Sequence, residues 1–284
     1  LKGVADPVRA YQVLRATGVR NRLYVDLGRL TPLVERDAEL NLLLGGKDQA
    51  LAGKGNAVVV TGEAGLGKSR LVQAFHERLT EEPHTLLQCQ CTPYARASAF
   101  FPLLETLRRS AGLDEQLDGD EQLRRLELAA ERVGLPASEV VPLIAPLLML
   151  PLPQHYGPQE DSPALRRQKT IAAMVSWILS LSEEQLLVVV VEDLHWSDFS
   201  TLEVVRALIE QSGNSRVLTC LTFRPEFEWP HPPRSEVTQI EINRLDAQQA
   251  LDLVSRMTGG LQLPPEVSAR IVDRAGGVPL FLEE

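Results

Sequence analysis

One stretch of this chain decides its fold: Asn56-Ala57-Val58-Val59-Val60-Thr61-Gly62-Glu63-Ala64-Gly65-Leu66-Gly67-Lys68-Ser69. It begins with an apolar, β-branched run, which predicts a strand. A glycine-rich segment follows and fits the pattern G-x-x-x-x-G-K-[ST]. The next residues, Arg70-Leu71-Val72-Gln73-Ala74-Phe75, have the spacing of an amphipathic helix. The order strand, glycine-rich loop, helix is typical of a phosphate-binding loop.

The residue types of this loop suit a nucleoside triphosphate. Glycines let the backbone curl so that successive N–H groups point at phosphate, and the following helix adds its free N–H groups and positive dipole end. Lys68 is expected to reach the β- and γ-phosphates, and Ser69 to place its hydroxyl on Mg²⁺. The alternative is a glycine-rich turn with an exposed lysine and serine. The predicted nucleotide-binding residues are Gly62, Glu63, Ala64, Gly65, Leu66, Gly67, Lys68, Ser69 and Arg70.

A second stretch adds acids to this picture: Leu186-Leu187-Val188-Val189-Val190-Val191-Glu192-Asp193. The apolar run predicts a central parallel strand buried on both faces, and parallel sheets bind ligands at the carboxyl ends of their strands. Downstream of a phosphate loop, Glu192 and Asp193 predict the metal side of a Mg²⁺–nucleotide site. One acid would hold Mg²⁺, directly or through water, and the other would polarise the attacking water. Either assignment is open. His195 and Trp196 are functional, or belong to a structural turn that packs the tryptophan.

Arg224 ends a further predicted strand, residues 216–223. An arginine at a strand end beside the acids would sense the γ-phosphate, and the alternative is a surface arginine in a loop.

Cys89 and Cys91 share one face of a predicted strand at residues 85–91. Buried strand cysteines are favoured over a metal site, because this segment shows too few further ligands.

The remaining pattern completes an alternation of strands and helices. Residues 237–242 predict a fifth strand, and residues 93–163, punctuated by prolines, predict a helical insertion. Thr31 is expected to cap a helix through Leu44 that Gly45-Gly46 weaken toward its end. A capping box at Ser200-Thr201-Leu202-Glu203 predicts the start of another helix. Further helices are expected over residues 165–181, 246–257, 265–274 and from Gly276 to Glu284.

The composition of the chain limits the number of domains, the kinds of partner and the cellular compartment that are expected. The 284 residues, 44% hydrophobic and 24% charged, suffice for one large or two modest domains. With a net charge of −9, the chain does not have the excess of basic residues that is typical of nucleic-acid-binding proteins. The three cysteines make no disulfide framework, so a cytoplasmic location is expected. No apolar run of about 18 uncharged residues occurs, so no membrane contact is expected. The chain starts at Leu1 without a signal peptide and is expected to be part of something longer.

Taken together, these motifs resemble the STAND class of P-loop NTPases, within the broader AAA-type ATPases. The resemblance covers residues 31 to 284. It is closest to the ATPase module of large bacterial regulators in which a class III nucleotide cyclase domain precedes the ATPase and tetratricopeptide-like repeats follow it. Its markers are the helix at residues 33–44, the loop Gly62–Ser69, Cys91-Thr92-Pro93-Tyr94, the segment Glu192–Asp198, Thr222-Phe223-Arg224-Pro225-Glu226 and Gly277-Val278-Pro279-Leu280-Phe281.

The resemblance implies an α/β P-loop NTPase fold with a parallel five-stranded sheet of order 5-1-4-3-2. It implies an ATPase domain at residues 25–243, with a helical insertion at about 93–163, and the start of a helical lid at residues 244–284. In the lid, the G-x-P turn would bring Pro279 near adenine, and Arg224 would be the strand-end sensor. Two departures from the family pattern are Glu35-Arg36, where Gly-Arg is usual, and Glu192-Asp193, where Asp-Asp or Asp-Glu is usual.

Residues 1–24 resemble the last strand of a class III cyclase domain, through the pattern L-K-G-x-x-x-P-V-x-x-Y-x-V. An unrelated N-terminal strand is the alternative. The segment contains no catalytic position of a cyclase, so no cyclase activity is expected from this chain.

The favoured function is an ATP-driven conformational switch that binds ATP or ADP with Mg²⁺, hydrolyses slowly, and acts on an upstream cyclase domain and a downstream repeat domain. A ring motor that self-associates with nucleotide is one alternative. A permanent nucleotide-binding scaffold is another, against which the intact Lys68, Ser69, Glu192 and Asp193 argue. A DNA-binding, initiator-like ATPase is disfavoured by the net charge of −9.

Overall fold

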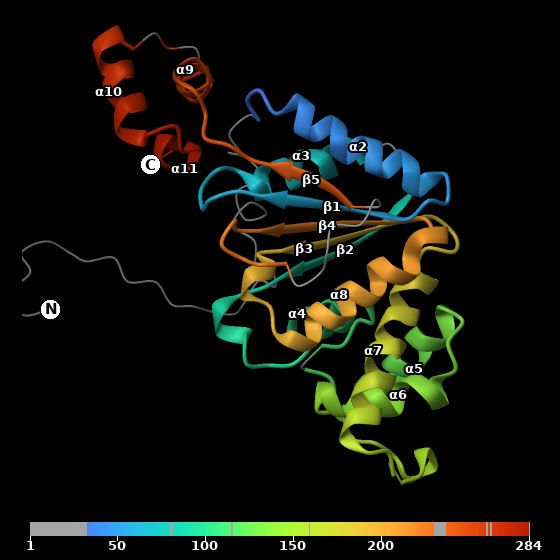
Figure 1. Ribbon diagram of the computed structural model, residues 1–284. Coiled ribbons are helices and arrows are strands. Elements are labelled where there is room, and N and C mark those ends of the chain that lie inside the picture. The colour runs from blue at the N-terminus through green and yellow to red at the C-terminus, as the bar shows by residue number, and fades with distance from the viewer. Residues whose placement is uncertain are drawn as a thin grey trace, which may run out of the picture. The chain divides into compact units, whose positions relative to one another are not determined.

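A parallel sheet of five strands forms the centre of the computed structural model (Figure 1). The structure describes residues 33–79, 82–114, 116–158, 160–229, 237–259, 261 and 263–283, which belong to one unit spanning residues 31–284. The predicted tail at residues 1–24 and the predicted cap at Thr31 lie outside the described residues. The strands are β1 (Asn56–Thr61), β2 (His84–Gln90), β3 (Leu186–Glu192), β4 (Val217–Phe223) and β5 (Val237–Glu241).

The strand order is β2-β3-β4-β1-β5, which confirms the predicted order 5-1-4-3-2 read from the other edge. All four pairings are parallel, so the carboxyl ends of the strands meet at one edge of the sheet. Thr61 pairs with Phe223, and Gln90 pairs with Glu192. The phosphate loop, the two acids and Arg224 therefore leave the sheet at the same edge.

Helices cover both faces of this sheet. In Figure 1, α2 and α3 lie over one face, and α4 and α8 lie over the other. The helices are α2 (Asp37–Leu51), α3 (Lys68–Leu79), α4 (Phe101–Ser110), α5 (Gly119–Arg132), α6 (Ala137–Ile144), α7 (Pro163–Ser180), α8 (Phe199–Gln211), α9 (Ala247–Met257), α10 (Pro265–Ala275) and α11 (Pro279–Glu283). Short 3-10 turns are η1 (Pro93–Ala95), η2 (Ala145–Leu148), η3 (Gln154–Tyr156), η4 (Leu194–Trp196) and η5 (Ser212–Asn214).

The valine run of β3 is buried along its whole length, as predicted for a central strand. Alternate residues of the run enter two different cores. Val188 and Val190 pack with α2 and α3, whereas Val189 and Val191 pack with the helices of the insertion and α8. Because side chains alternate across a strand, Glu192 points to the same face as Val190, which is the face that α3 covers.

Helix α2 differs from the prediction at both ends. It begins at Asp37 without a side-chain cap, after Glu35, whose φ of 47° is left-handed. It then continues through Gly45-Gly46 to Leu51, so the expected weakening there is wrong. A Cβ at Gly46 would lie 3.0 Å from Asn56 Oδ1 and 3.1 Å from Val58 Cγ2. Glycine at this position lets the helix approach β1 closely, and tertiary packing outweighs its poor helix propensity.

The predicted capping box at Ser200–Glu203 is wrong as well. Helix α8 begins earlier, and its cap is Asp198, whose Oδ1 accepts from the N–H groups of Ser200 (2.9 Å) and Thr201 (3.0 Å). The same oxygen also accepts from the N–H of Phe100 at 3.2 Å. Asp198 is buried, so one carboxylate both caps the helix and anchors the loop that follows β2.

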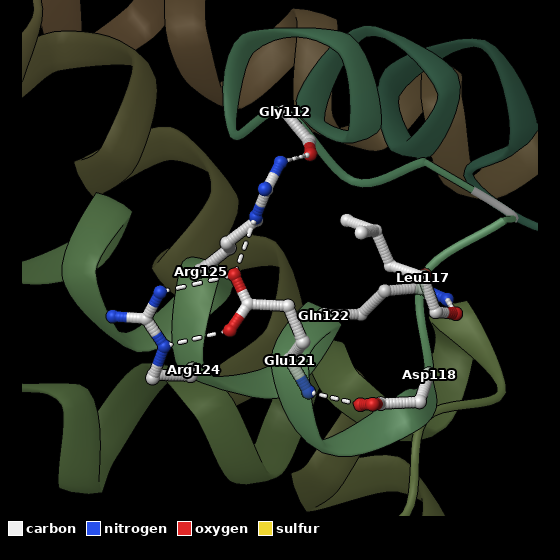
Figure 2. Close-up of polar contacts among 7 residues, drawn as sticks. All are labelled: Gly112, Leu117, Asp118, Glu121, Gln122, Arg124 and Arg125. Carbon is white, nitrogen blue, oxygen red and sulfur yellow. Dashed lines mark hydrogen bonds and ion pairs between the residues drawn. The ribbon is translucent and has the colours of Figure 1, made fainter.

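The insertion is helical, as predicted, and polar contacts hold its α4–α5 connection (Figure 2). Asp118 caps α5 by accepting from Glu121 N–H at 2.7 Å. The Glu121 carboxylate accepts from Arg124 and Arg125, and Arg125 also donates to the Gly112 carbonyl at 2.7 Å. Hydrogen bonds from Arg124 and then Arg125 lower the pKa of Glu121 to about 2. The network ties the end of α4 to the first turn of α5.

Within the described residues, no helix has the length and apolar character that crossing a membrane requires.

Candidate nucleotide-binding site

The phosphate loop leaves β1 and turns directly into α3. Helix α3 begins at Lys68, so the last two residues of the motif already form its first turn. Gly65 and Gly67 have φ values of 80° and 95°, which glycine adopts without the strain that a side chain would add. The free N–H groups of the first turn of α3 accompany a positive dipole end, which is the arrangement that binds phosphate.

Lys68 is enclosed by its own loop. Its side chain is buried, and Nζ donates to the carbonyl oxygens of Gly62 (2.8 Å) and Glu63 (2.9 Å). Burial lowers the pKa of Lys68, Arg224 lowers it further, and the charges of Asp193 and Glu226 oppose these effects. The alternative interpretation, a glycine-rich turn with an exposed lysine, does not fit, because Lys68 is buried.

Ser69 and Arg70 follow on α3. Ser69 lies in the first turn of α3, directly after the loop. Arg70 instead faces along the helix, because its Nη1 lies 3.5 Å from Glu77 Oε1, one ion pair within α3. The structure therefore gives Arg70 a contact away from the loop, while Ser69 stays beside it.

The first acid, Glu192, ends β3 and is 1% exposed. Its Oε1 accepts a hydrogen bond from the side-chain amide of Gln88 at 2.8 Å. Gln88 belongs to β2, the edge strand next to β3. The buried carboxylate is thus held by a neutral donor.

The second acid, Asp193, has left the strand. Its φ of 54° and ψ of 43° are left-handed, a conformation that aspartate tolerates better than most residues. Its backbone N–H donates to Thr222 Oγ1 on β4 at 3.0 Å, and its Oδ2 accepts from the side-chain amide of Gln90 at 2.8 Å. Aspartate at the second position of the pair therefore suits the local backbone.

His195 lies among the charges of the site. Burial lowers its pKa, Asp193 and Glu226 act to raise it, and Arg224 and Lys68 act to lower it. In the part of the chain that the structure describes, neither ring nitrogen of His195 has a hydrogen-bond partner. Trp196 is partly buried against the core of the insertion. The tryptophan therefore has a packing role, and a functional role for His195 stays a prediction.

Arg224 follows β4 and joins this group. Its guanidinium carbon lies 5.9 Å from the centre of the Trp196 ring, a cation–π distance. Its charge acts to lower the pKa of both Lys68 and His195, so the arginine lies within electrostatic range of the phosphate loop. Arg224 is half-buried in the loop that follows β4, so the γ-phosphate sensor and the loop arginine both stay predictions.

The C-terminal helices rest on the phosphate loop. The N–H of Leu280 donates to the Gly65 carbonyl at 3.2 Å, and a Cβ at Gly65 would lie 3.0 Å from both Val278 and Leu280. Val278 packs in the same core as Leu66 of the loop. Pro279 opens α11, between these two contact residues. In Figure 1, α11 lies at the end of the sheet where the loop joins α3.

An ion pair adds to this contact. Arg244 Nη2 lies 2.6 Å from Glu63 Oε2, and both side chains are about half exposed. The backbone is fixed alongside, because the Leu245 N–H donates to the Gly277 carbonyl at 2.8 Å. A Cβ at Gly277 would lie 2.3 Å from the Leu245 carbonyl oxygen, so only glycine fits at the second position of this turn.

These residues suit Mg²⁺ bound together with a nucleotide. Mg²⁺ takes oxygen ligands, commonly one or two carboxylates completed by phosphate oxygens and water. Glu192 and Asp193 carry carboxylate oxygens at the carboxyl end of β3, and Ser69 carries a hydroxyl at the start of α3. No group of three or more histidine, cysteine, aspartate or glutamate side chains within the described residues forms an all-protein metal site. The cysteines agree with the sequence interpretation, because Cys89, Cys91 and Cys220 are free and buried.

Sequence reasoning missed Gln88, Gln90, Thr222 and Arg244. Gln88 and Gln90 alternate with the buried cysteines, so their position on the other face of β2 was readable. Their contact with the acids depends on β2 lying next to β3, which residue patterns do not state.

Comparisons with known proteins agree with this geometry. The family model described as "AAA ATPase domain" matches residues 32–220. An uncharacterized protein of Rhizobium meliloti (strain 1021) is 29% identical over 287 residues, covering 100% of this chain. The chain spans only 28% of that relative's length.

Two solved structures, Drosophila ORC bound to DNA and the ORC1 protein of Aeropyrum pernix in complex with DNA, share the fold. The Drosophila complex matches with a TM-score of 0.52 and 11% identity, over 98% of this chain and 63% of that one. The ORC1 protein of Aeropyrum pernix matches with a TM-score of 0.50 and 16% identity, over 93% and 61%. At these identities the likeness concerns the P-loop NTPase fold alone. The family match, which covers most of the chain and includes both the phosphate loop and the acidic strand, shows that this chain belongs to the AAA ATPase domain family.

Proposed function

We propose that this chain is a nucleotide-dependent switch that binds ATP or ADP with Mg²⁺ and hydrolyses ATP slowly. The observation that carries the proposal is the contact between Leu280 and Gly65, which joins α11 to the phosphate loop. Because the loop that would hold the phosphates also supports the C-terminal helices, occupancy of the site and the pose of these helices are energetically coupled.

In the proposed bound state, Lys68 exchanges its partners. Its ammonium now donates to the carbonyl oxygens of Gly62 and Glu63, and phosphate oxygens would replace them. The backbone N–H groups of residues 62–69 and the start of α3 would surround the β- and γ-phosphates. Charged acceptors form stronger hydrogen bonds than neutral carbonyls, which favours the exchange.

For the acids, we propose a division of labour. Glu192 points to the face that α3 covers, where Ser69 lies, so these two residues would hold Mg²⁺, directly or through water. Asp193 would accept a proton from, and orient, the attacking water, because it lies beyond the strand end. Mg²⁺, when bound, neutralises charge on the phosphate oxygens.

Arg224 is proposed as the sensor of the γ-phosphate. Its guanidinium already acts electrostatically on Lys68 and rests near the Trp196 ring. A bound γ-phosphate offers a stronger, bidentate partner than an aromatic face. Pro279 is proposed to lie against the base, from its position at the start of α11.

The test combines nucleotide binding with steady-state hydrolysis. The wild-type protein should bind ATP with Mg²⁺ and turn it over well below the 1–10³ s⁻¹ that is typical of enzymes. Lys68→Ala should abolish binding, whereas Lys169→Ala, which removes an ion pair with Asp161 on the insertion, should leave binding unchanged. Turnover of many per second without a partner would contradict a switch. A stable hexamer with ATP in light scattering would favour the ring motor instead.

The role of the whole protein is a further proposal. The sequence resemblance to cyclase-linked regulators supports a signalling protein in which this ATPase controls an attached cyclase domain and a repeat domain. The free, buried cysteines support a reducing, cytoplasmic compartment. DNA binding, which the structures of Drosophila ORC and Aeropyrum pernix ORC1 display, is less suited to a chain with a net charge of −9.

A further inference from the structure

Two histidines lie beside each other at the edge of the sheet opposite the phosphate loop. His76 belongs to the last turn of α3, and His84 is the first residue of β2. Their ring centroids are 5.9 Å apart, and the ring planes make an angle of 78°. Both side chains are partly exposed, so a small ion can reach them from solvent. The proposed nucleotide site uses neither of them.

The distance between the two rings is one that a shared metal ion permits. A zinc–nitrogen bond to histidine is about 2.1 Å long, which places the ion about 3.2 Å from each ring centroid. Two rings bound to one ion are then about 5.2 Å apart at the tetrahedral angle and about 6.4 Å apart on opposite sides of the ion. The observed 5.9 Å lies between these values, so little movement of either ring is needed.

The backbone prepares one of the two rings for a metal. His84 Nδ1 lies 2.8 Å from the Glu82 carbonyl oxygen. Because a carbonyl oxygen only accepts, Nδ1 carries the proton, and Nε2 of the neutral ring keeps its lone pair. Histidines that bind metals are commonly held by such a bond from their other nitrogen. Within the described residues no hydrogen bond involves the ring of His76, so none of them competes with a metal for its nitrogens.

The charges around His84 favour a cation. Lys47 is the basic side chain joined to this corner, and its Nζ lies 2.9 Å from Glu82 Oε1 and 3.2 Å from Asp48 Oδ1. Two carboxylates therefore offset one ammonium. The second carboxylate oxygen of Glu82 is buried and has no hydrogen-bond partner in the part of the chain that the structure describes. A divalent ion would thus bind in surroundings with a negative balance of charge.

We propose that His76 and His84 bind a divalent transition-metal ion, Zn²⁺ or Cu²⁺, whose remaining ligands are water. Imidazole nitrogen suits these ions, whereas Mg²⁺ and Ca²⁺ take oxygen ligands. The ion would join the end of α3 to the start of β2. The other ends of these two elements lie at the nucleotide site, so the ion would fasten the support of that site from behind. The inference does not depend on nucleotide binding.

The experiment measures Cu²⁺ binding to the whole chain by electron paramagnetic resonance, in which each bound imidazole nitrogen splits the signal. The variants are His76→Gln and His84→Gln. His155→Gln is the matched control, because His155 also lies beside an aromatic ring, that of Tyr156 at 4.3 Å, but on the insertion. Thermal unfolding with Zn²⁺, and again after EDTA, gives a second measurement on the same proteins.

The wild type should show the splitting of two nitrogens. Each variant of the pair should weaken Cu²⁺ binding at least about tenfold and remove the two-nitrogen splitting, whereas His155→Gln should bind as the wild type does. Zn²⁺ at about a hundredfold excess over its dissociation constant should raise the unfolding midpoint of the wild type by about 5 °C, reversibly with EDTA. Neither variant of the pair should show this rise.

His84→Gln also loses the bond to Glu82, so if it does not fold, His76→Gln alone decides the question. Equal Cu²⁺ binding by the wild type and His76→Gln, or an equal loss in His155→Gln, would mean an adventitious ion only and would overturn the inference. ATP binding by the same proteins tests the proposed function separately, since neither histidine belongs to that site.

Discussion

Arg244 and Glu63 form an ion pair of 2.6 Å that joins the C-terminal helices to the phosphate loop. The two residues are far apart in sequence: Glu63 follows the first glycine of the loop, and Arg244 precedes Leu245, whose N–H donates to the Gly277 carbonyl. The pair therefore joins the phosphate loop to the segment that leads into α9.

Breaking this ion pair should weaken the contact between the C-terminal helices and the phosphate loop, while nucleotide binding is retained. Arg244→Glu places a like charge opposite Glu63, so the dissociation rate of a fluorescent ADP analogue should rise. Because both side chains are about half exposed, the effect should stay within about fivefold, which corresponds to an exposed pair worth up to 1 kcal/mol. Stopped-flow displacement measures the rate. The double variant Glu63→Arg with Arg244→Glu restores opposite charges and should return the rate toward that of the wild type. If the ADP analogue dissociates from the double variant as fast as from Arg244→Glu, the ion pair does not control nucleotide release.

Gly65→Ala should release α11 from the loop. A Cβ at this position would lie 3.0 Å from Val278 and Leu280, in addition to the strain of a φ of 80°. Gly67→Ala is the matched control, since its φ of 95° gives similar strain but no atom lies within 4 Å of its Cβ.

In the nucleotide-free protein, both variants should lose about 1 kcal/mol to backbone strain, and Gly65→Ala should lose a further 1 kcal/mol or more to the overlap. Urea denaturation gives the two values. Limited proteolysis should cut residues 261–283 faster in Gly65→Ala alone. Equal stability and equal proteolysis of the two variants would mean that the docking of α11 on Gly65 does not persist in solution.

Asp198→Ala should destabilise the protein more than the loss of an exposed helix cap would. The carboxylate accepts from two N–H groups of α8 and from the N–H of Phe100, and it is buried. Loss of the cap and of the Phe100 partner should lower the free energy of unfolding by roughly 2–3 kcal/mol. Asp246→Ala removes a similar cap from α9 at an exposed site and should cost only about 1 kcal/mol. Chemical denaturation of the two variants makes the comparison, and equal costs would contradict the bridging role of Asp198.

Glu35 occupies the position where the family pattern has glycine, and its φ of 47° retains the conformation that glycine favours. Glu35→Gly should therefore change stability by less than about 1 kcal/mol, because relief of strain offsets the larger entropy of the unfolded chain. Glu35→Val should lower it by 1 kcal/mol or more, since β-branched residues fit this conformation poorly. Thermal denaturation measures both. A valine variant as stable as the glycine variant would argue that the turn before α2 is not left-handed in solution.

The sequence by itself determined the nucleotide loop, the strands and the strand that ends in two acids. These features depend on local patterns. The glycine spacing is typical of a phosphate-binding loop, and the continuous apolar run is typical of a strand that is buried on both faces of a sheet. The sheet order followed from the family resemblance, and the structure bears it out. The continuation of α2 through Gly45-Gly46, where local interpretation was wrong, depends on a distant segment, because Gly46 lies against β1.

Only the tertiary structure decided what surrounds the acids and what touches the loop. Gln88 and Gln90 reach Glu192 and Asp193 across about a hundred residues of chain, because the helical insertion returns β3 to the side of β2. Arg244 meets Glu63 because the strand before it, β5, lies next to β1. Such contacts depend on which strands become neighbours. A pattern of residue types marks the strands themselves, and their order places the side chains that hold the site in position.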